Sequence, residues 1–180
     1  MRIVLVCPDG LSILLFCKGI IRVLQSIPGA HVIVACDTGA YKQEIEDLRV
    51  TIVSVRMYRW MNPLEDLKYM WRLWRLFRRE HSDVVLNFST KPNIYGSIAA
   101  KLAGTPLILS HVVGLGAGFQ PRDDLVGRLL RNSLTCLYRL ACSFSSKIWF
   151  TNANDRQYYL EQGLVTEDKA VLTQNYLDVS

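Results

Sequence analysis

Short apolar runs alternate with longer segments of helical period along the chain. The short runs are rich in β-branched residues and nearly uniformly apolar, which is typical of strands that are covered on both faces. The pattern predicts strands at Ile3–Cys7, His31–Cys36, Thr51–Val55, Val84–Phe88, Leu107–Ser110, Lys147–Thr151 and Ala170–Thr173. Between them it predicts helices at Ser12–Ser26, Tyr41–Leu48, Pro63–Glu80, Ile94–Ala103, Asp124–Cys142 and Ala153–Gln162.

Several helix ends are marked by residues with a known capping role. Asn62 is the expected N-cap of the helix that starts at Pro63, with Glu65 as the acid of a capping box. Gly104 and Gly163 are expected to end two later helices. The strict alternation of strand and helix predicts an α/β fold: a doubly wound parallel sheet in a Rossmann-like, three-layer α/β/α domain over residues 1–173. Ligands of such a fold bind beyond the carboxyl ends of the strands.

Composition narrows the functional classes only a little. The 180 residues carry 21 Lys and Arg against 16 Asp and Glu, a formal net charge of +5, so the position of the cations matters more than their number. The five cysteines are odd in number and lack a C-x-x-C spacing. A disulfide framework and a zinc site are therefore not expected, and a reducing, cytosolic setting is. No uncharged apolar run reaches the roughly 18 residues of a spanning helix, so a soluble or peripheral protein is expected.

The turn after the first strand contains Asp9 and Gly10. It lacks the G-x-G-x-x-G pattern of a dinucleotide site and the G-x-x-x-x-G-K-[ST] pattern of a P-loop. Backbone N–H groups at the start of the following helix still offer a weak site for an anion or a hydroxyl. The alternative, which this turn alone favours, is an ordinary connection between a strand and a helix.

The helix predicted at 63–80 combines an apolar arc with a basic stripe. The arc comprises Leu67, Met70, Trp71, Leu73, Trp74 and Phe77, and the stripe comprises Lys68, Arg72, Arg75 and Arg79. The favoured interpretation is a crossover helix whose apolar arc packs on the sheet while its cations are solvated. The second is a membrane surface, in which the cations and the nearby Trp60 and Tyr69 meet anionic headgroups. Nucleic-acid binding ranks below both because no nucleic-acid-binding motif is present.

Two loops at strand ends carry candidate chemistry. Lys91 and Asn93 follow the strand at Val84–Phe88 and suit a polar or phosphorylated ligand, although Asn93 equally suits a helix cap, with Lys91 in solvent. His111 precedes a glycine-rich loop; a histidine there could titrate near neutrality as a donor, acceptor or base, but a lone histidine more often has a structural role. No carboxylate orients it, and no paired carboxylates stand at strand ends, so neither a triad nor a double-displacement hydrolase is expected.

A set of stretches in a fixed order carries a family resemblance: RWMNPLEDL at 59–67, DVV at 83–85, STKP at 89–92, GSIAAKLAGTP at 96–106, GLG at 114–116 and IWFTNAND at 148–155. Over nearly all of residues 1–178 the chain resembles the N-terminal, acceptor-side domain of GT-B glycosyltransferases of the glycosyl transferase family 4-like group. That group includes bacterial enzymes that build capsule, O-antigen and related surface glycans. No single motif is diagnostic, but the order and spacing of all of them together are fairly specific.

The resemblance implies one half of a GT-B fold, with residues 174–180 as the start of the linker to a missing C-terminal domain that binds the donor. It implies retaining transfer, with no metal or cofactor, from a nucleotide sugar to a lipid-linked glycan at the inner face of the cytoplasmic membrane, with no nucleic acid as partner. The chain alone is expected to be inactive. The resemblance assigns the acceptor to Lys91, Asn93, Gly114, Leu115 and Gly116, catalysis to His111, the donor side to Asp9 and Gly10, and phospholipid to Lys68, Arg72, Arg75 and Arg79.

Two alternatives from other classes stay open. A sugar-nucleotide epimerase also uses the two-domain GT-B plan, but it does not need a basic, aromatic helix. A non-catalytic subunit that recruits a separate catalytic chain to the membrane needs that helix but no second domain of its own. Lipid binding and the activity of the complete protein separate these alternatives from a transferase.

Overall fold

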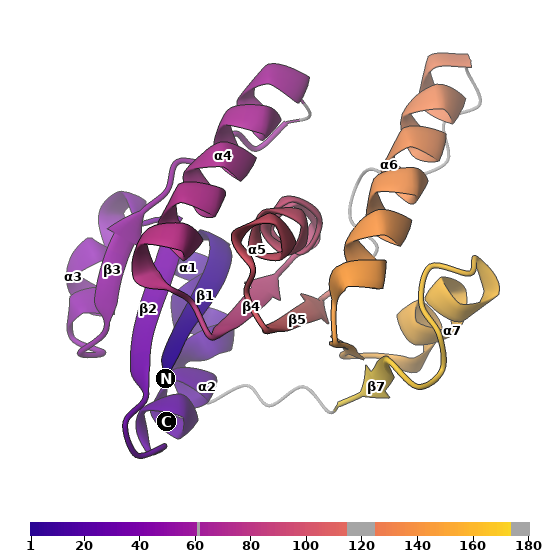
Figure 1. Ribbon diagram of the computed structural model, residues 1–180. Coiled ribbons are helices and arrows are strands. Elements are labelled where there is room, and N and C mark those ends of the chain that lie inside the picture. The colour runs from indigo at the N-terminus through magenta and orange to yellow at the C-terminus, as the bar shows by residue number, and fades with distance from the viewer. Residues whose placement is uncertain (61, 115–124, 174–180) are drawn as a thin grey trace.

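Seven parallel strands form a single open sheet in the computed structural model, which describes residues 1–60, 62–114 and 125–173 (Figure 1). The order across the sheet is β3-β2-β1-β4-β5-β6-β7. The strands are β1 (Arg2–Asp9), β2 (His31–Asp37), β3 (Thr51–Ser54), β4 (Val84–Phe88), β5 (Leu107–Val112), β6 (Lys147–Phe150) and β7 (Ala170–Leu172). The predicted doubly wound parallel sheet is confirmed.

Helices cover both faces of the sheet. The first face carries α1 (Gly10–Ser12), η1 (Ile13–Cys17), α2 (Lys18–Gln25), η2 (Gly39–Tyr41) and α3 (Lys42–Glu46), and the second carries α4 (Pro63–Glu80), η3 (Pro92–Gly96), α5 (Ser97–Ala103) and α6 (Leu125–Phe144). The remaining helix, α7 (Ala153–Glu161), connects β6 to β7. The three layers of the predicted architecture are therefore present. The segment 174–180, expected to begin a linker, lies outside the described residues.

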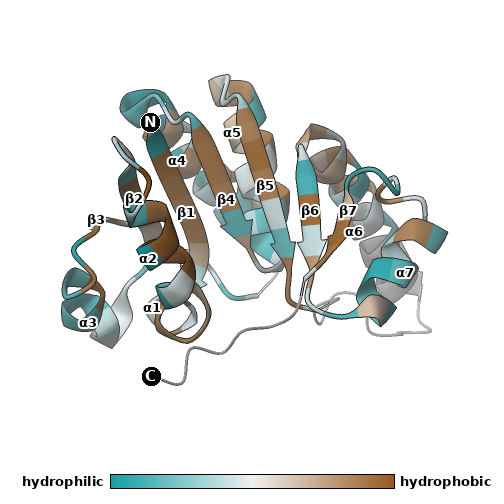
Figure 2. Ribbon diagram, turned by 90° about the horizontal axis from the view of Figure 1, so that it is seen from below, coloured by the Kyte–Doolittle hydropathy of each residue, from teal (hydrophilic) through white to brown (hydrophobic). Residues whose placement is uncertain are grey.

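The two-residue period of the strands divides the core between the faces. Ile3, Leu5 and Cys7 of β1 pack against η1 and α2, whereas Val4 and Val6 pack against α4 and α5. Figure 2 shows the central strands as hydrophobic over most of their length, with polar residues at their ends. Both faces of β1 and β4 are buried, so their carboxyl ends are held in fixed positions beneath the loops that follow them.

The ends of α4 follow from its sequence, with one difference. The side chain of Asn62 accepts a hydrogen bond from the backbone N–H of Glu65 at 3.3 Å, as an N-cap does, and Pro63 begins the helix. The return bond of the capping box comes from Asp66, whose Oδ2 accepts from the backbone N–H of Asn62 at 3.4 Å. Glu65 pairs instead with Lys68. The predicted role of Glu65 is therefore taken by Asp66, which faces the interior.

The buried face of α4 differs from the predicted apolar arc. Tyr69, Leu73 and Phe77 are fully buried, whereas Leu67 and Trp71 are 58% and 51% exposed. Apolar residues surround much of this helix, so the contact surface offered by the sheet and α5 decides which of them pack inside. The interpretation that the whole arc packs on the sheet is wrong for Leu67 and Trp71, and the placement of Tyr69 beside lipid is wrong because its ring is buried.

Candidate functional site

The strand order places a crevice at the carboxyl ends of β1 and β4. From β1 the chain builds outward through β2 and β3, and from β4 it builds outward in the opposite direction. Such a switch point is where ligands of open α/β sheets bind. A hollow of about 90 Å³ lies there, lined in part by Pro8 and Phe16 from the β1 side, Phe88 and Ser89 from β4, and Val113 after β5. Ligand pockets span roughly 300–1,000 Å³, so this hollow by itself is too small to enclose a ligand.

A larger hollow of about 430 Å³ lies at the opposite edge of the sheet. It is lined by residues at the ends of α4 and α5, among them Arg78, His81 and Asp83. This edge carries the amino ends of β4 and β5, where parallel sheets of this class do not place their ligands. The smaller hollow at the switch point is therefore the candidate functional site.

Asp9 and Gly10 form the β1 side of the site. The carboxylate of Asp9 caps α1 by accepting hydrogen bonds from the backbone N–H and the hydroxyl of Ser12, at 2.8 and 2.9 Å. Gly10 is buried, and a Cβ atom on it would lie 2.6 Å from the carbonyl oxygen of Thr38. The close packing of this turn on the segment after β2 therefore requires glycine, and a donor-facing role for Asp9 and Gly10 stays a prediction.

The β4 side of the site has a strained turn. Ser89 has φ of 77°, a left-handed conformation that is rare outside glycine. Its backbone N–H donates to the carbonyl oxygen of His111 at 3.2 Å, which joins the ends of β4 and β5. Residues held in this way cluster at functional sites, and the sequence carries no signal for the strain because serine does not require such a φ.

Asn93 does not cap a helix. Helical conformation begins at Thr90, ahead of Asn93, so Asn93 lies inside the π-helical turn η3. Its side chain is buried and its amide donates to the carbonyl oxygen of His111 at 2.8 Å. The amide oxygen has no hydrogen-bond partner among the described residues. Asn93 therefore ties η3 to the end of β5, and its contact with an acceptor stays a prediction.

His111 is held between two aromatic rings at the end of β5. Its ring centroid lies 5.2 Å from that of Phe88 and 5.3 Å from that of Trp149. Burial lowers the pKa of the imidazole from 6.5 to about 4, and Nδ1 has no hydrogen-bond partner within the described part of the chain. The expectation that His111 titrates near neutrality is therefore wrong, because the surrounding rings exclude the water that stabilises the charged form. A neutral imidazole that donates or accepts one hydrogen bond is what this site offers.

The lowered pKa of His111 predicts a loss of stability in mild acid. Above pH 6.5 the imidazole is neutral in both states. Between pH 6.5 and about 4 the unfolded chain binds a proton that the folded chain does not, so the free energy of unfolding decreases as the pH is lowered. At pH 5 the loss from this group is about 2 kcal/mol. Urea denaturation at pH 7 and pH 5 measures it: His111→Gln should lack this component, and the exposed His81→Gln should retain it. Equal losses in all three proteins would contradict the prediction.

Lys91 does not point into solvent. Its ammonium group donates to the backbone carbonyls of Tyr58 and Trp60, both at 2.8 Å, and pairs with the carboxylate of Asp66 at 2.5 Å. Three acceptors satisfy the three N–H groups of a lysine. The predicted acceptor contact of Lys91 is not tested by this geometry, but the charge of its side chain is already compensated inside the protein. Asp66 was not among the predicted residues, because an acid in the first turn of a helix has an ordinary role there.

Of the glycine loop after β5, only Gly114 is described; it is half-buried, beside Val113 of the hollow. Leu115 and Gly116 lie outside the described residues.

Among the described residues, no three His, Cys, Asp or Glu side chains gather closely enough to hold a metal ion. Throughout the same residues, no helix combines the length and the apolar character needed to cross a bilayer.

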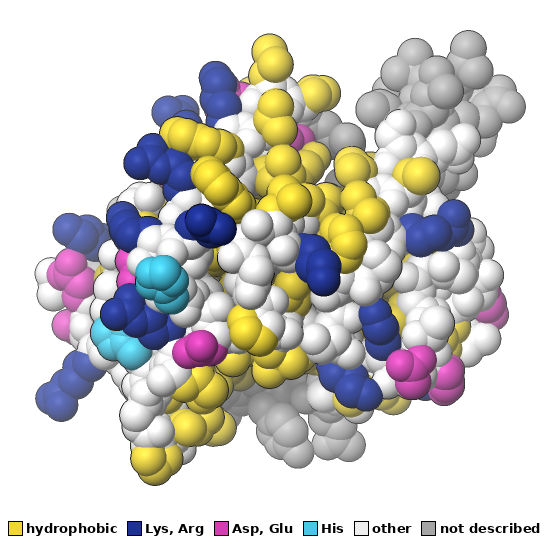
Figure 3. Space-filling view, in the orientation of Figure 1, with side chains coloured by type: hydrophobic (Ala, Val, Ile, Leu, Met, Phe, Trp, Pro, Cys, Tyr) yellow, Lys and Arg dark blue, Asp and Glu magenta, His cyan; other side chains and the backbone are white. Residues whose placement is uncertain are grey.

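The outer face of α4 is an apolar ridge flanked by cations. The ridge is formed by Trp60, Leu64, Leu67 and Trp71, which are 69%, 73%, 58% and 51% exposed. The predicted basic stripe lies beside it, and Figure 3 shows Lys and Arg side chains next to hydrophobic ones over α4. Lys68 pairs with Glu65, Arg79 pairs with Glu80, and the guanidinium of Arg75 lies 4.7 Å from the ring centroid of Trp71. The structure thus adds exposed apolar side chains to a surface that was predicted mainly from its charge.

Comparison with known proteins places these features in a family. The model of the glycosyl transferase 4-like domain matches residues 25–175. An N,N'-diacetylbacillosaminyl-diphospho-undecaprenol alpha-1,3-N-acetylgalactosaminyltransferase of Campylobacter jejuni is 28% identical over 165 residues, which cover 91% of this chain and 43% of that enzyme. A UDP-Gal:alpha-D-GlcNAc-diphosphoundecaprenol alpha-1,3-galactosyltransferase of Escherichia coli is 34% identical over 82 residues, covering 44% of this chain and 21% of that enzyme.

The fold is also similar to solved structures. A UDP-N-acetylglucosamine 2-epimerase superposes with a TM-score of 0.69 at 15% identity, over 97% of this chain and 48% of that one. At this identity the similarity shows the fold alone. The chain spans less than half the length of each of these proteins.

Proposed function

This chain belongs to the glycosyl transferase 4-like family, and from this we propose that it is the acceptor-side half of a retaining glycosyltransferase. In the complete protein it works with a second, donor-binding domain to transfer a sugar from a nucleotide sugar to a lipid-diphosphate-linked glycan in bacterial surface polysaccharide synthesis. The observation that carries the proposal is the similarity to the Campylobacter transferase over 91% of the chain. The open edge at the β1–β4 switch point supports it, because that edge is where such a fold binds ligands.

We assign the site residues the roles that the family resemblance implies. Asn93, Gly114, Leu115 and Gly116 bind the acceptor, and Asp9 and Gly10 belong to the donor side. His111 contributes a neutral imidazole to the reacting groups. Lys91 supports the acceptor side indirectly, because its ammonium group is bound to Asp66 and to two backbone carbonyls.

The transfer reaction is tested with the complete protein, a panel of radiolabelled nucleotide sugars and short-chain polyprenyl-diphosphate-linked sugar acceptors. The expected result is an extended, lipid-linked product that retains the anomeric configuration of the donor, and no product from residues 1–180 alone. Turnover of a nucleotide sugar to its epimer without any acceptor would favour the epimerase. An absence of both products, together with binding of a catalytic partner chain, would favour the recruiting subunit.

We place the outer face of α4 on the cytoplasmic surface of the membrane. The ridge of Trp60, Leu64, Leu67 and Trp71 suits the boundary between headgroups and acyl chains, and the stripe of Lys68, Arg72, Arg75 and Arg79 suits anionic lipid. Each cation near such a surface contributes about 1 kcal/mol at most, and partners within the helix reduce this. The apolar ridge therefore supplies much of the binding, and the protein is peripheral at the inner face of the membrane.

Vesicle binding tests this surface. Serine at the four ridge positions is expected to lower sedimentation with vesicles of anionic and zwitterionic phospholipid at least tenfold, since each removed apolar side chain costs about 1 kcal/mol or more. Charge reversal of Lys68, Arg75 and Arg79 should remove only the dependence on anionic lipid; Arg72 is left unchanged because its guanidinium donates to the carbonyl oxygen of Arg56. Serine at Val23 and Leu102, which are 65% and 62% exposed on other helices, is the matched control and should leave binding unchanged. Full binding by the ridge variant would contradict the placement.

A further inference from the structure

The ion pair between Lys91 and Asp66 lies where two functional regions of the domain meet. On one side is the site at the end of β4, and on the other is the loop of residues 55–60 that leads from β3 into α4. Both charged side chains are nearly buried, at 12% exposure for Lys91 and 4% for Asp66. A buried pair of this kind needs additional hydrogen bonds to offset the loss of water from both charges, so its other partners show what it holds in place.

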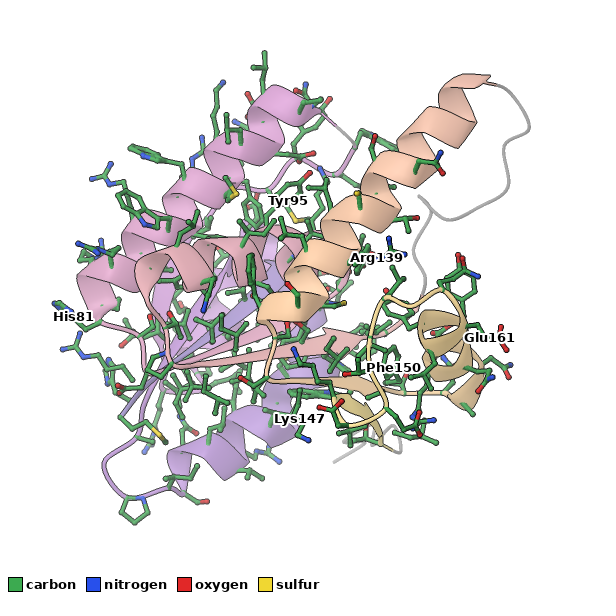
Figure 4. All side chains as sticks on the ribbon, turned by 45° about the vertical axis from the view of Figure 1, so that its right-hand side comes forward. His81, Tyr95, Arg139, Lys147, Phe150 and Glu161 are labelled. Atoms are coloured by element: carbon green, nitrogen blue, oxygen red, sulfur yellow. The ribbon has the colours of Figure 1, made fainter. Side chains whose placement is uncertain are left out.

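The carboxylate of Asp66 accepts hydrogen bonds from three donors in two segments of the chain. Oδ1 accepts from Lys91, while Oδ2 accepts from the hydroxyl of Tyr95 at 3.2 Å and from the backbone N–H of Asn62 at 3.4 Å. Burial, together with the carboxylate, raises the pKa of Tyr95, so its hydroxyl remains a donor at neutral pH. Figure 4 shows Tyr95 in the space between α4 and α6. Asp66 thus joins the start of α4 to η3.

The ammonium group of Lys91 holds the loop of residues 55–60. It binds the carbonyl oxygens of Tyr58 and Trp60, and a third carbonyl of the loop, that of Arg56, accepts from Arg72 at 3.2 Å. These residues form no regular secondary structure, so side-chain donors fix their backbone. The loop carries Trp60 of the ridge and, two residues before it, Tyr58; these side chains are 69% and 44% exposed.

At the other end, Lys91 belongs to the acceptor side of the site. It lies two residues from the strained Ser89 and two from Asn93, and the backbone N–H of Asn93 donates to the carbonyl of Ser89 at 2.9 Å. Asn93 in turn binds the carbonyl of His111. A displacement of Lys91 therefore moves the residues that border the hollow, and a displacement of the loop pulls on Lys91.

We propose that Lys91 and Asp66 are positioning residues that hold the membrane-facing loop at a fixed place relative to the acceptor site. The inference rests on the proposed function. It assigns Lys91 the task of aligning the lipid-embedded part of the substrate with the reacting sugar, so that the acceptor enters the site directly from the bilayer. Neither residue contacts the reacting atoms.

The test uses Lys91→Met combined with Asp66→Asn in the complete protein. This pair removes both charges, which avoids a lone buried charge, and the asparagine still accepts from Tyr95. Lys169→Met is the matched control, because Lys169 also donates to backbone carbonyls, those of Cys142 and Ser143, but away from the membrane loop. The double variant is expected to raise the KM for a long-chain acceptor in vesicles about tenfold more than it raises the KM for a short-chain, detergent-soluble acceptor. The control variant should behave as wild type with both acceptors.

A loss of turnover with both acceptors would overturn the proposal in favour of direct contact between Lys91 and the substrate. Unchanged kinetics with both acceptors would overturn it as well.

Limited trypsin digestion tests the tie without any activity. Arg59 lies exposed in the loop, and cleavage there requires release of the backbone around it. Wild type is expected to be cleaved after Arg59 at least tenfold more slowly than the double variant. Wild-type cleavage as fast as that of an unfolded peptide of the same sequence would overturn the proposal, and this result is available even if the double variant fails to fold. If wild type resists trypsin but transfers no sugar, the proposed function fails while the tie stands.

Discussion

Replacing Gly96 with alanine is expected to lower the free energy of unfolding by about 3 kcal/mol. A Cβ atom at this position would lie 2.1 Å from Oδ1 and 2.9 Å from Cγ of Asn87. Asn87 is fully buried in β4, and its amide donates to the hydroxyl of Ser97 at 3.1 Å, so it cannot move without losing that bond. Urea denaturation followed by circular dichroism at pH 7 measures the change.

Gly19→Ala is the matched control for this prediction. Gly19 lies in α2, and nothing stands within 4 Å of the position of its Cβ atom. Alanine there should raise stability by about 0.5–1 kcal/mol because glycine is a poor helix former. A further test is Asn87→Ala, which removes the clashing group and should reduce the cost of Gly96→Ala by more than 1 kcal/mol in a double-mutant cycle. A Gly96→Ala protein as stable as wild type would contradict the geometry.

The clash at Gly96 illustrates what sequence patterns do and do not predict. The strand β4 and a helix after it were predicted, because a uniformly apolar run followed by small and apolar residues at helical spacing indicates both. The need for glycine at 96 was not, because it arises from a buried asparagine that a strand pattern gives no reason to expect. The helix also begins at Thr90 instead of Ile94. Its first residues include the π-helical turn η3, and a pattern based on the period of an α-helix does not detect such a turn.

The assignment of faces on α4 failed for a related reason. Leu67 and Trp71 share the helical period of the buried residues, so the pattern alone places them inside. The shape of the sheet and of α5 selects Tyr69, Leu73 and Phe77 instead. The same selection leaves the ridge on the outer surface, which strengthens the membrane interpretation that the sequence ranked second.

The sequence indicated which loops come together more accurately than it indicated what their side chains contact. Residues after β1, β4 and β5 line one hollow at the switch point, as the strand order requires. Yet the partners of Lys91 come from residues 58, 60 and 66, and the rings around His111 come from β4 and β6. Contacts between segments so far apart in sequence set the charge state and orientation of these side chains, and no local motif encodes them.

His111→Gln in the complete protein is expected to lower kcat/KM for sugar transfer about 100- to 1,000-fold, the range for loss of a positioned acid–base or hydrogen-bonding group. The carbonyl of His111 is held by Ser89 and Asn93, and its ring is held by Phe88 and Trp149. Its orientation is therefore preorganised, and glutamine in its place does not reproduce the ring contacts. The rate is measured with saturating acceptor and varied nucleotide sugar at pH 7.

The pH dependence of the wild-type enzyme separates this role from that of an ordinary titrating histidine. With its pKa lowered to about 4 by burial, His111 is neutral throughout the range from pH 5.5 to 8. Under the proposed role, His111 is a fixed, neutral hydrogen-bond partner of the reacting groups, and kcat/KM should then show no step near pH 6.5 that disappears in His111→Gln. His81→Gln, at the opposite edge of the sheet, should retain full activity. Activity of His111→Gln within threefold of wild type would contradict a catalytic role. The buried imidazole, whose Nδ1 has no hydrogen-bond partner among the described residues, would then be a structural feature of the core.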